Sequence, residues 1–107
     1  MDRERIYEVI EYFKQCLITN GIEPVELILF GSQAKLYAEE ESDIDIAVVS
    51  EKFKGLDIFQ RAELLNKSEI DTIKRFLVPI DVISMTKEEL EDEDSLISEV
   101  VKCGEIV

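Results

Sequence analysis

The chain has 107 residues, which fits a single domain over residues 1–107 that buries most of an apolar core. Hydrophobic residues make up 46% of it, so it is not a disordered chain, and no apolar run approaches the about 20 residues of a transmembrane helix. The net charge of −13 argues against broad binding to nucleic acids or anionic membranes, and it favours metal cations and a basic protein partner.

Two absences narrow the possible functions further. The chain contains no histidine, which excludes a zinc site built on histidine and catalysis with histidine as the base. The charged, amphipathic residues 1–13 lack the apolar core of a signal peptide. We therefore expect a cytoplasmic protein.

The first half of the chain predicts alternating helices and strands. Apolar residues at helical spacing lead to a C-terminal cap at Gly21, and an apolar run later stops at Gly31. Ser32 would cap the helix that follows. The expected elements are, in order, a helix over 2–20, a strand over 25–30, a short helix over 32–39 and a strand over 43–50.

The second half continues the alternation. Its expected elements are a helix over 56–66 with a further turn or two over 68–76, a strand over 79–84, a helix that starts at the capping box of Thr86, and a last helix over 95–103. This order predicts a small α/β domain whose sheet is covered by helices.

Two aspartates begin the strand over residues 43–50. Because side chains alternate across a strand, Asp43 and Asp45 lie on one face, roughly 6.6–7 Å apart along the backbone. Two carboxylates so close resist joint ionisation unless a cation lies between them, and Mg²⁺ prefers such oxygen ligands. If the strand with Asp81 lies beside this one, three carboxylates converge, and two metals about 3.5–4 Å apart could bind there.

The turn at Gly31-Ser32 is a candidate phosphate site. Glycine allows close approach of the backbone, and the N–H groups at a helix start favour anions. By itself, Ser32 is more often only a helix cap, and Lys35 is first read as a surface lysine, with a phosphate contact as its alternative role. The combination of this turn with the aspartates is what indicates a triphosphate bridged by metal.

At these residues the chain resembles the minimal nucleotidyltransferases (MNT domains) of the DNA polymerase beta-like superfamily. The shared pattern is LILFGS, ten residues, then DIDIAVV, with Asp81 of PIDVIS on a later strand and the closing SLISEVVKCGEIV. The resemblance implies an α+β sandwich, the nucleotidyltransferase fold, in which helices cover a small mixed or antiparallel sheet.

The resemblance also implies the ligands and the roles of the residues. Gly31 and Ser32 would bind the phosphates of a nucleoside triphosphate. Asp43 and Asp45 would bind two Mg²⁺ ions, and Asp81 would bind the catalytic metal and help to deprotonate the attacking hydroxyl.

Family members of this size commonly act as antitoxins beside a HEPN-domain ribonuclease toxin. The resemblance then implies transfer of AMP from ATP to a tyrosine of that toxin, which silences it. Two alternatives stay open: a binding module that neutralises its partner by contact alone, and a nucleotidyltransferase that modifies a small molecule. The carboxylate set argues against the first, and the lack of room for an acceptor-binding domain argues against the second.

Overall fold

The structure, a computed structural model, describes residues 2–31 and 43–107. Its elements are α1 (Arg3–Thr19), β1 (Glu26–Phe30), β2 (Ile44–Val49), the 3-10 helix η2 (Glu51–Phe53), α2 (Ile58–Phe76), β3 (Ile80–Met85), α3 (Lys87–Leu90), α4 (Leu96–Lys102) and β4 (Glu105–Ile106). The helix expected over 32–39 lies outside the described residues. No helix in the described ranges combines the length and the apolarity needed to cross a bilayer.

The strands form one mixed sheet in the order β3-β2-β1-β4. β1 runs antiparallel to both β2 and β4, whereas β2 and β3 are parallel. Parallel neighbours need a long crossover connection, and α2 supplies it between β2 and β3. The four strands and the helices around them confirm the predicted α+β fold with a mixed sheet.

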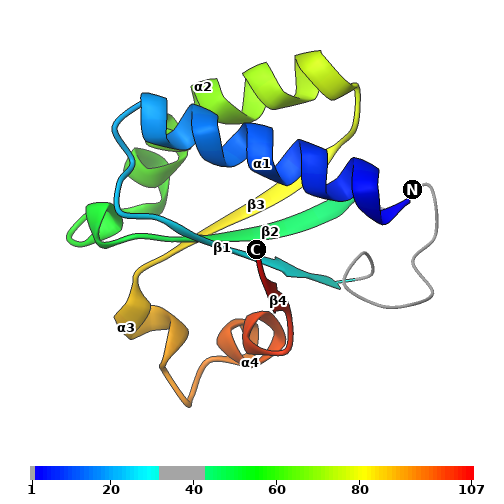
Figure 1. Cartoon of the computed structure of the whole chain (residues 1–107). Coiled ribbons are helices and arrows are strands. Elements are labelled where there is room, and N and C mark those ends of the chain that lie inside the picture. Colours follow the sequence, from blue (N-terminus) through cyan, green and yellow to red (C-terminus); the bar gives the residue numbers. More distant parts are fainter. Residues whose placement is uncertain (1, 32–42) are drawn as a thin grey trace.

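Helices cover both faces of the sheet, with α1 and α2 on one side and α3 and α4 on the other (Figure 1). The face under α1 and α2 carries the larger core, to which the sheet contributes Leu27, Leu29, Ile44, Ile46 and Val48. On the other face, a smaller apolar cluster includes Val101 of α4 and is contacted by Leu90 of α3. The alternation of apolar side chains along β1 and β2 thus fills two layers.

The sequence predicted a helix over 56–66 and a further turn or two over 68–76, and the structure joins them into α2. An Asp57–Gln60 capping box starts this helix, and Leu77 ends it in a left-handed conformation. Polar Ser68 stays inside the helix because it is fully buried and bonded: its hydroxyl accepts a hydrogen bond of 2.9 Å from Asn20. Contact with α1 therefore keeps this stretch helical, although its polar residues led to the prediction of a break in the helix.

The C-terminal tail forms a short strand that the sequence did not predict. Gly104 lets the tail approach β1 closely, because a Cβ there would lie 2.9 Å from a side-chain carbon of Ile28 and 3.0 Å from one of Phe30. Glu105 of β4 then accepts hydrogen bonds from Arg3 at 2.6 Å and Tyr7 at 2.7 Å. These contacts tie β4 to α1 as well as to β1.

Candidate active site

Asp45 and Asp81 lie directly opposite each other on the parallel strands β2 and β3. Neighbouring strands are about 4.8 Å apart, and residues in register point to the same face of a sheet. Asp43 lies two residues before Asp45, immediately ahead of β2. The structure therefore brings together the backbone positions of all three aspartates that the sequence singled out.

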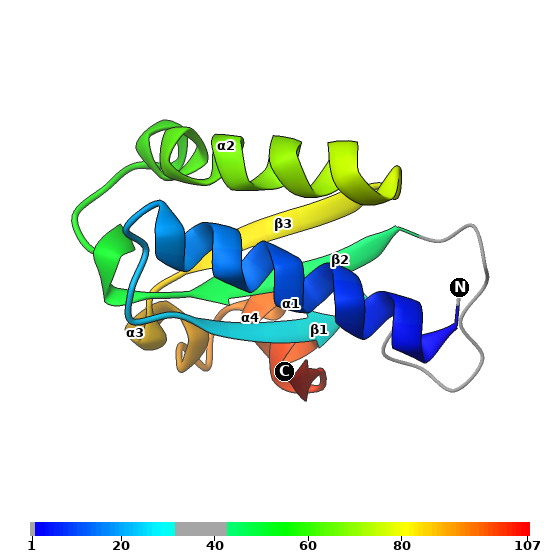
Figure 2. The same ribbon diagram turned by 45° about the horizontal axis from the view of Figure 1, so that its top comes forward.

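These aspartates share the sheet face that α3 and α4 cover farther along the strands. Beyond Asp45 and Asp81, the residues on this face are apolar and belong to the smaller core; they are Ala47, Val49, Ile83 and Met85. Figures 1 and 2 both show α3 at the opposite end of the sheet from the start of β2. Asp43 and Asp81 are consequently exposed, and Asp45 is half-buried.

Gly31 forms the other wall beside Asp45. It follows β1 directly, and the last residue of that strand, Phe30, pairs with Asp45. Gly31 has a φ of +73°, and a Cβ on it would overlap a carboxylate oxygen of Asp45 and lie 2.9 Å from its Cγ. Only glycine permits this backbone conformation and this close approach together. Ser32 and Lys35, predicted to bind phosphate with Gly31, lie outside the described residues.

The carboxylate of Asp45 has a raised pKa. Partial burial is the main cause, and the negative charges of Asp81 and then Asp43 add to it. The charges of both other aspartates therefore act on Asp45, as expected for carboxylates gathered in one negative site. A cation bound there would relieve the repulsion.

The donors at this site match Mg²⁺ in type. Mg²⁺ takes oxygen ligands, commonly from one or two carboxylates together with the phosphates of a substrate. Within residues 2–31 and 43–107, no three acidic or sulfur side chains are already close enough to enclose an ion. The fit thus rests on the donor type, on the register of Asp45 with Asp81 and on the close approach of Gly31 to Asp45.

A fourth carboxylate, which the sequence analysis missed, comes from α2. Glu69 is half-buried, and its pKa is raised by burial and by the charge of Asp81. The signal for it is its helical spacing, since Glu69 lies four residues after Leu65 and three before Thr72, both buried. Glu69 extends the negative site from the sheet to the neighbouring helix.

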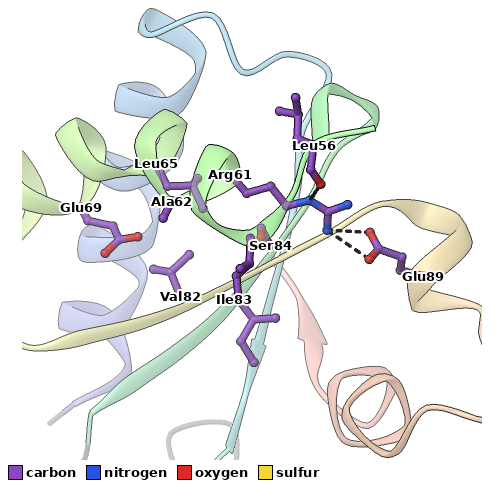
Figure 3. A pocket seen from close by; sticks show the side chains of 10 residues that line it. Leu56, Arg61, Ala62, Leu65, Glu69, Val82, Ile83, Ser84 and Glu89 are labelled. Carbon is purple, nitrogen blue, oxygen red and sulfur yellow. Dashed lines mark hydrogen bonds and ion pairs between the residues drawn. The ribbon is translucent and has the colours of Figure 1, made fainter. Parts of the chain in front are cut away.

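Glu69 also lines a cleft between α2 and β3, drawn in Figure 3. The cleft has a volume of about 490 Å³, and its walls include Ala62, Leu65 and Val82. Arg61 lies toward its other end and is paired with Glu89, while Glu69 points toward Val82 (Figure 3). A cleft with apolar walls therefore follows the edge of the sheet, and Glu69 at one end of it is influenced by the charge of Asp81.

Comparison with known proteins assigns the chain to a protein family. It matches the family model described as Polymerase beta, Nucleotidyltransferase over residues 9–107. It is similar in fold to the crystal structure of a proposed nucleotidyltransferase from Sulfolobus solfataricus, with a TM-score of 0.60, 21% identity, and coverage of 99% of this chain and 87% of that one. No curated protein gives a significant match. Because the family model spans nearly the whole chain, this protein belongs to the polymerase beta nucleotidyltransferase family.

Proposed function

We propose that the protein transfers AMP from ATP, in the presence of Mg²⁺, to a tyrosine hydroxyl of a partner protein. The observation that carries the proposal is the register of Asp45 with Asp81 on adjacent strands, with Gly31 against Asp45. Membership of the family supports nucleotidyl transfer in general. The choice of AMP and of a protein acceptor rests on the resemblance to minimal nucleotidyltransferases.

Asp43, Asp45 and Asp81 would hold two Mg²⁺ ions. When bound, the ions neutralise the charge of the triphosphate and stabilise the charge that develops on the reacting phosphate. The carboxylates of Asp45 and Asp81 stand on paired strands of the sheet, and Gly31 leaves room for the phosphates to approach the backbone. Ser32 and Lys35 would add contacts to the phosphates.

In the transfer step, the hydroxyl oxygen of the acceptor forms a bond to the α-phosphorus of ATP. The bond between that phosphorus and the oxygen that bridges to the β-phosphate breaks, and pyrophosphate leaves. The proton of the hydroxyl passes to the carboxylate of Asp81, which is exposed and can meet an incoming acceptor.

The proposed partner is a HEPN-domain toxin, which the modification would silence. This proposal is supported by the resemblance of the chain to MNT antitoxins. The net charge of −13 also suits a basic, RNA-binding partner, because opposite charges steer association. Acceptor recognition would then come from the surface of the complex.

The experiment uses ATP labelled at its α-phosphate, Mg²⁺ and a HEPN-domain protein as the candidate partner. Wild type should transfer label to the toxin and inhibit it, and Asp43→Asn/Asp45→Asn should lose the transfer. Asp92→Asn/Asp94→Asn is the matched control, since it removes the same two charges at the same spacing from an exposed segment. Inhibition by the active-site double variant that equals wild type, without label transferred by either, would establish neutralisation by contact alone.

A further inference from the structure

The outer edge of β3 is open along the candidate active site. Among residues 2–31 and 43–107, β3 pairs only with β2. The carbonyl of Met85 accepts a hydrogen bond of 2.9 Å from Ser50 at the end of β2, so the backbone of Met85 turns inward. Because backbone groups alternate along a strand, Val82 and Ser84 turn their N–H and C=O groups outward. Such a row of groups is a template for another strand.

The cleft described above runs beside this edge. Val82, Ile83 and Ser84 of β3 form one wall, and Ala62 and Leu65 of α2 form the opposite wall (Figure 3). A strand added to the edge of β3 would place alternate side chains on the α2 side of the sheet. The volume of about 490 Å³ is large enough for such side chains, and the walls favour apolar ones.

Charge distinguishes the two ends of the cleft. Arg61 is already compensated, since it bonds both carboxylate oxygens of Glu89 at 2.8 and 3.1 Å and the carbonyl of Leu56 at 3.1 Å. No hydrogen bond or ion pair joins the carboxylate of Glu69 to another described residue, and the like charge of Asp81 helps to raise its pKa. Among the described residues, the end near the active site is therefore negative and has no paired counter-charge. It fits a lysine or arginine side chain.

We propose that an extended segment of the acceptor protein docks as an added strand on the edge of β3, with apolar residues at the alternate positions that face the cleft and a basic residue at the cleft-facing position nearest Glu69. This inference rests on the proposed function, because it names the place where the acceptor binds. Backbone hydrogen bonds to Val82 and Ser84 hold the segment, and Glu69 binds its basic side chain. Since Asp81 belongs to the same strand, the docked segment runs past the carboxylate that takes the hydroxyl proton. Strand addition thus supplies acceptor recognition from the nucleotidyltransferase domain itself.

The probe is a fluorescent peptide with valine at alternate positions, lysine in place of the last of these valines and tyrosine at its end, with binding followed by anisotropy. Ser84→Pro removes one outward N–H, a change that edge strands tolerate, and should weaken binding about tenfold. Ser84→Ala keeps that N–H and should bind as wild type does. Glu69→Lys should also weaken binding, whereas Glu63→Lys is its control, with the same charge change on an exposed part of α2 outside the cleft.

A second peptide, methylated on alternate backbone nitrogens, keeps every charge and side chain but cannot pair with an edge. Equal binding of the two peptides, or binding that Ser84→Pro leaves unchanged, would overturn the docking proposal. Self-association of the protein that Ser84→Pro abolishes, measured by sedimentation, would also overturn it, because a second copy would then occupy the edge.

Transfer of labelled AMP separates this inference from the proposed function. Transfer to the toxin that Ser84→Pro leaves at the wild-type rate keeps the function and rejects the docking edge. Peptide binding that depends on the edge, with no label transferred to any acceptor, rejects the function and reduces the edge to a binding surface. Loss of transfer in Ser84→Pro, with Mg²⁺-dependent ATP binding intact, is the result that we expect.

Discussion

The backbone of Gly31 lies against the side chain of Asp45, so closely that no side chain fits between them. The turn after β1 and the carboxylate on β2 are thus one structural unit, joined through the antiparallel pair of Phe30 and Asp45. A substitution at Gly31 should therefore displace the carboxylate of Asp45, and a substitution at Asp45 should affect the turn at Gly31.

We expect Gly31→Ala to weaken Mg²⁺-ATP binding strongly, because the added Cβ displaces the carboxylate of Asp45. The positive φ adds strain, which should lower stability by about 1 kcal/mol or more. Gly21→Ala is the matched control: its φ of +88° imposes the same strain, but a Cβ there has no atom within 4 Å. Calorimetry and thermal melting separate the effects. Equal ATP affinity in the two variants would show that the contact has no part in binding.

Asp45→Asn should stabilise the metal-free protein at neutral pH. The folded state raises the pKa of Asp45 above 3.8, the ordinary value for an aspartate, so folding favours the protonated form. Stability from this group is present at low pH and is lost as pH rises through the folded pKa. In EDTA the variant should melt above wild type at pH 7, and the difference should vanish below about pH 3.8. Asp92→Asn, on an exposed segment, is the control.

ATP should bind only together with a divalent cation. The triphosphate would otherwise meet the negative charges of Asp43, Asp45 and Asp81 in a protein whose net charge is already −13. Calorimetric titration of ATP with Mg²⁺, and again in excess EDTA, measures the dependence. Affinity that EDTA leaves unchanged would contradict a metal bridge between the carboxylates and the phosphates.

Gly104→Ala should detach β4 from β1. The added Cβ would press on the carbonyl of Leu29 and on the side chains of Ile28 and Phe30, which belong to the sheet and cannot easily move. We expect a lower melting temperature and faster hydrogen exchange at Val107, whose N–H donates to Leu27. Cys103→Ala changes the exposed neighbour and should leave both measurements unchanged.

The sequence predicted the strands well because each carries a local signal. The apolar runs after Pro24, after Asp43 and after Pro79 gave β1, β2 and β3 to within one residue at each end. To predict that Asp81 lies beside Asp45 required the resemblance or the structure. The parallel pairing of β2 with β3 depends on how the crossover through α2 returns the chain to the sheet, and the sequence of neither strand reveals it.

Two features escaped prediction for a common reason. Glu105–Ile106 became a strand only because Gly104 allows the tail to approach β1, and Glu69 joined the negative site only because α2 lies over the edge of β3. Both depend on contacts between residues distant in sequence. Glu105–Ile106 leaves no periodic pattern in its own segment, and the helical spacing of Glu69 shows its place beside Leu65 and Thr72 but not the neighbourhood of Asp81.

Asp45 and Asp81 differ in how firmly the sheet holds them. β2 is an inner strand with a neighbour on each side, whereas β3 is bonded to the sheet along one side within the described residues. Inner strands open with the whole molecule, and edge strands can shift at lower free energy. The site therefore has one carboxylate on a firmly held strand, Asp45 on β2, and one on a strand that can shift, Asp81 on β3. A change in carboxylate spacing between substrate and product states would be a movement of β3 against a stationary β2.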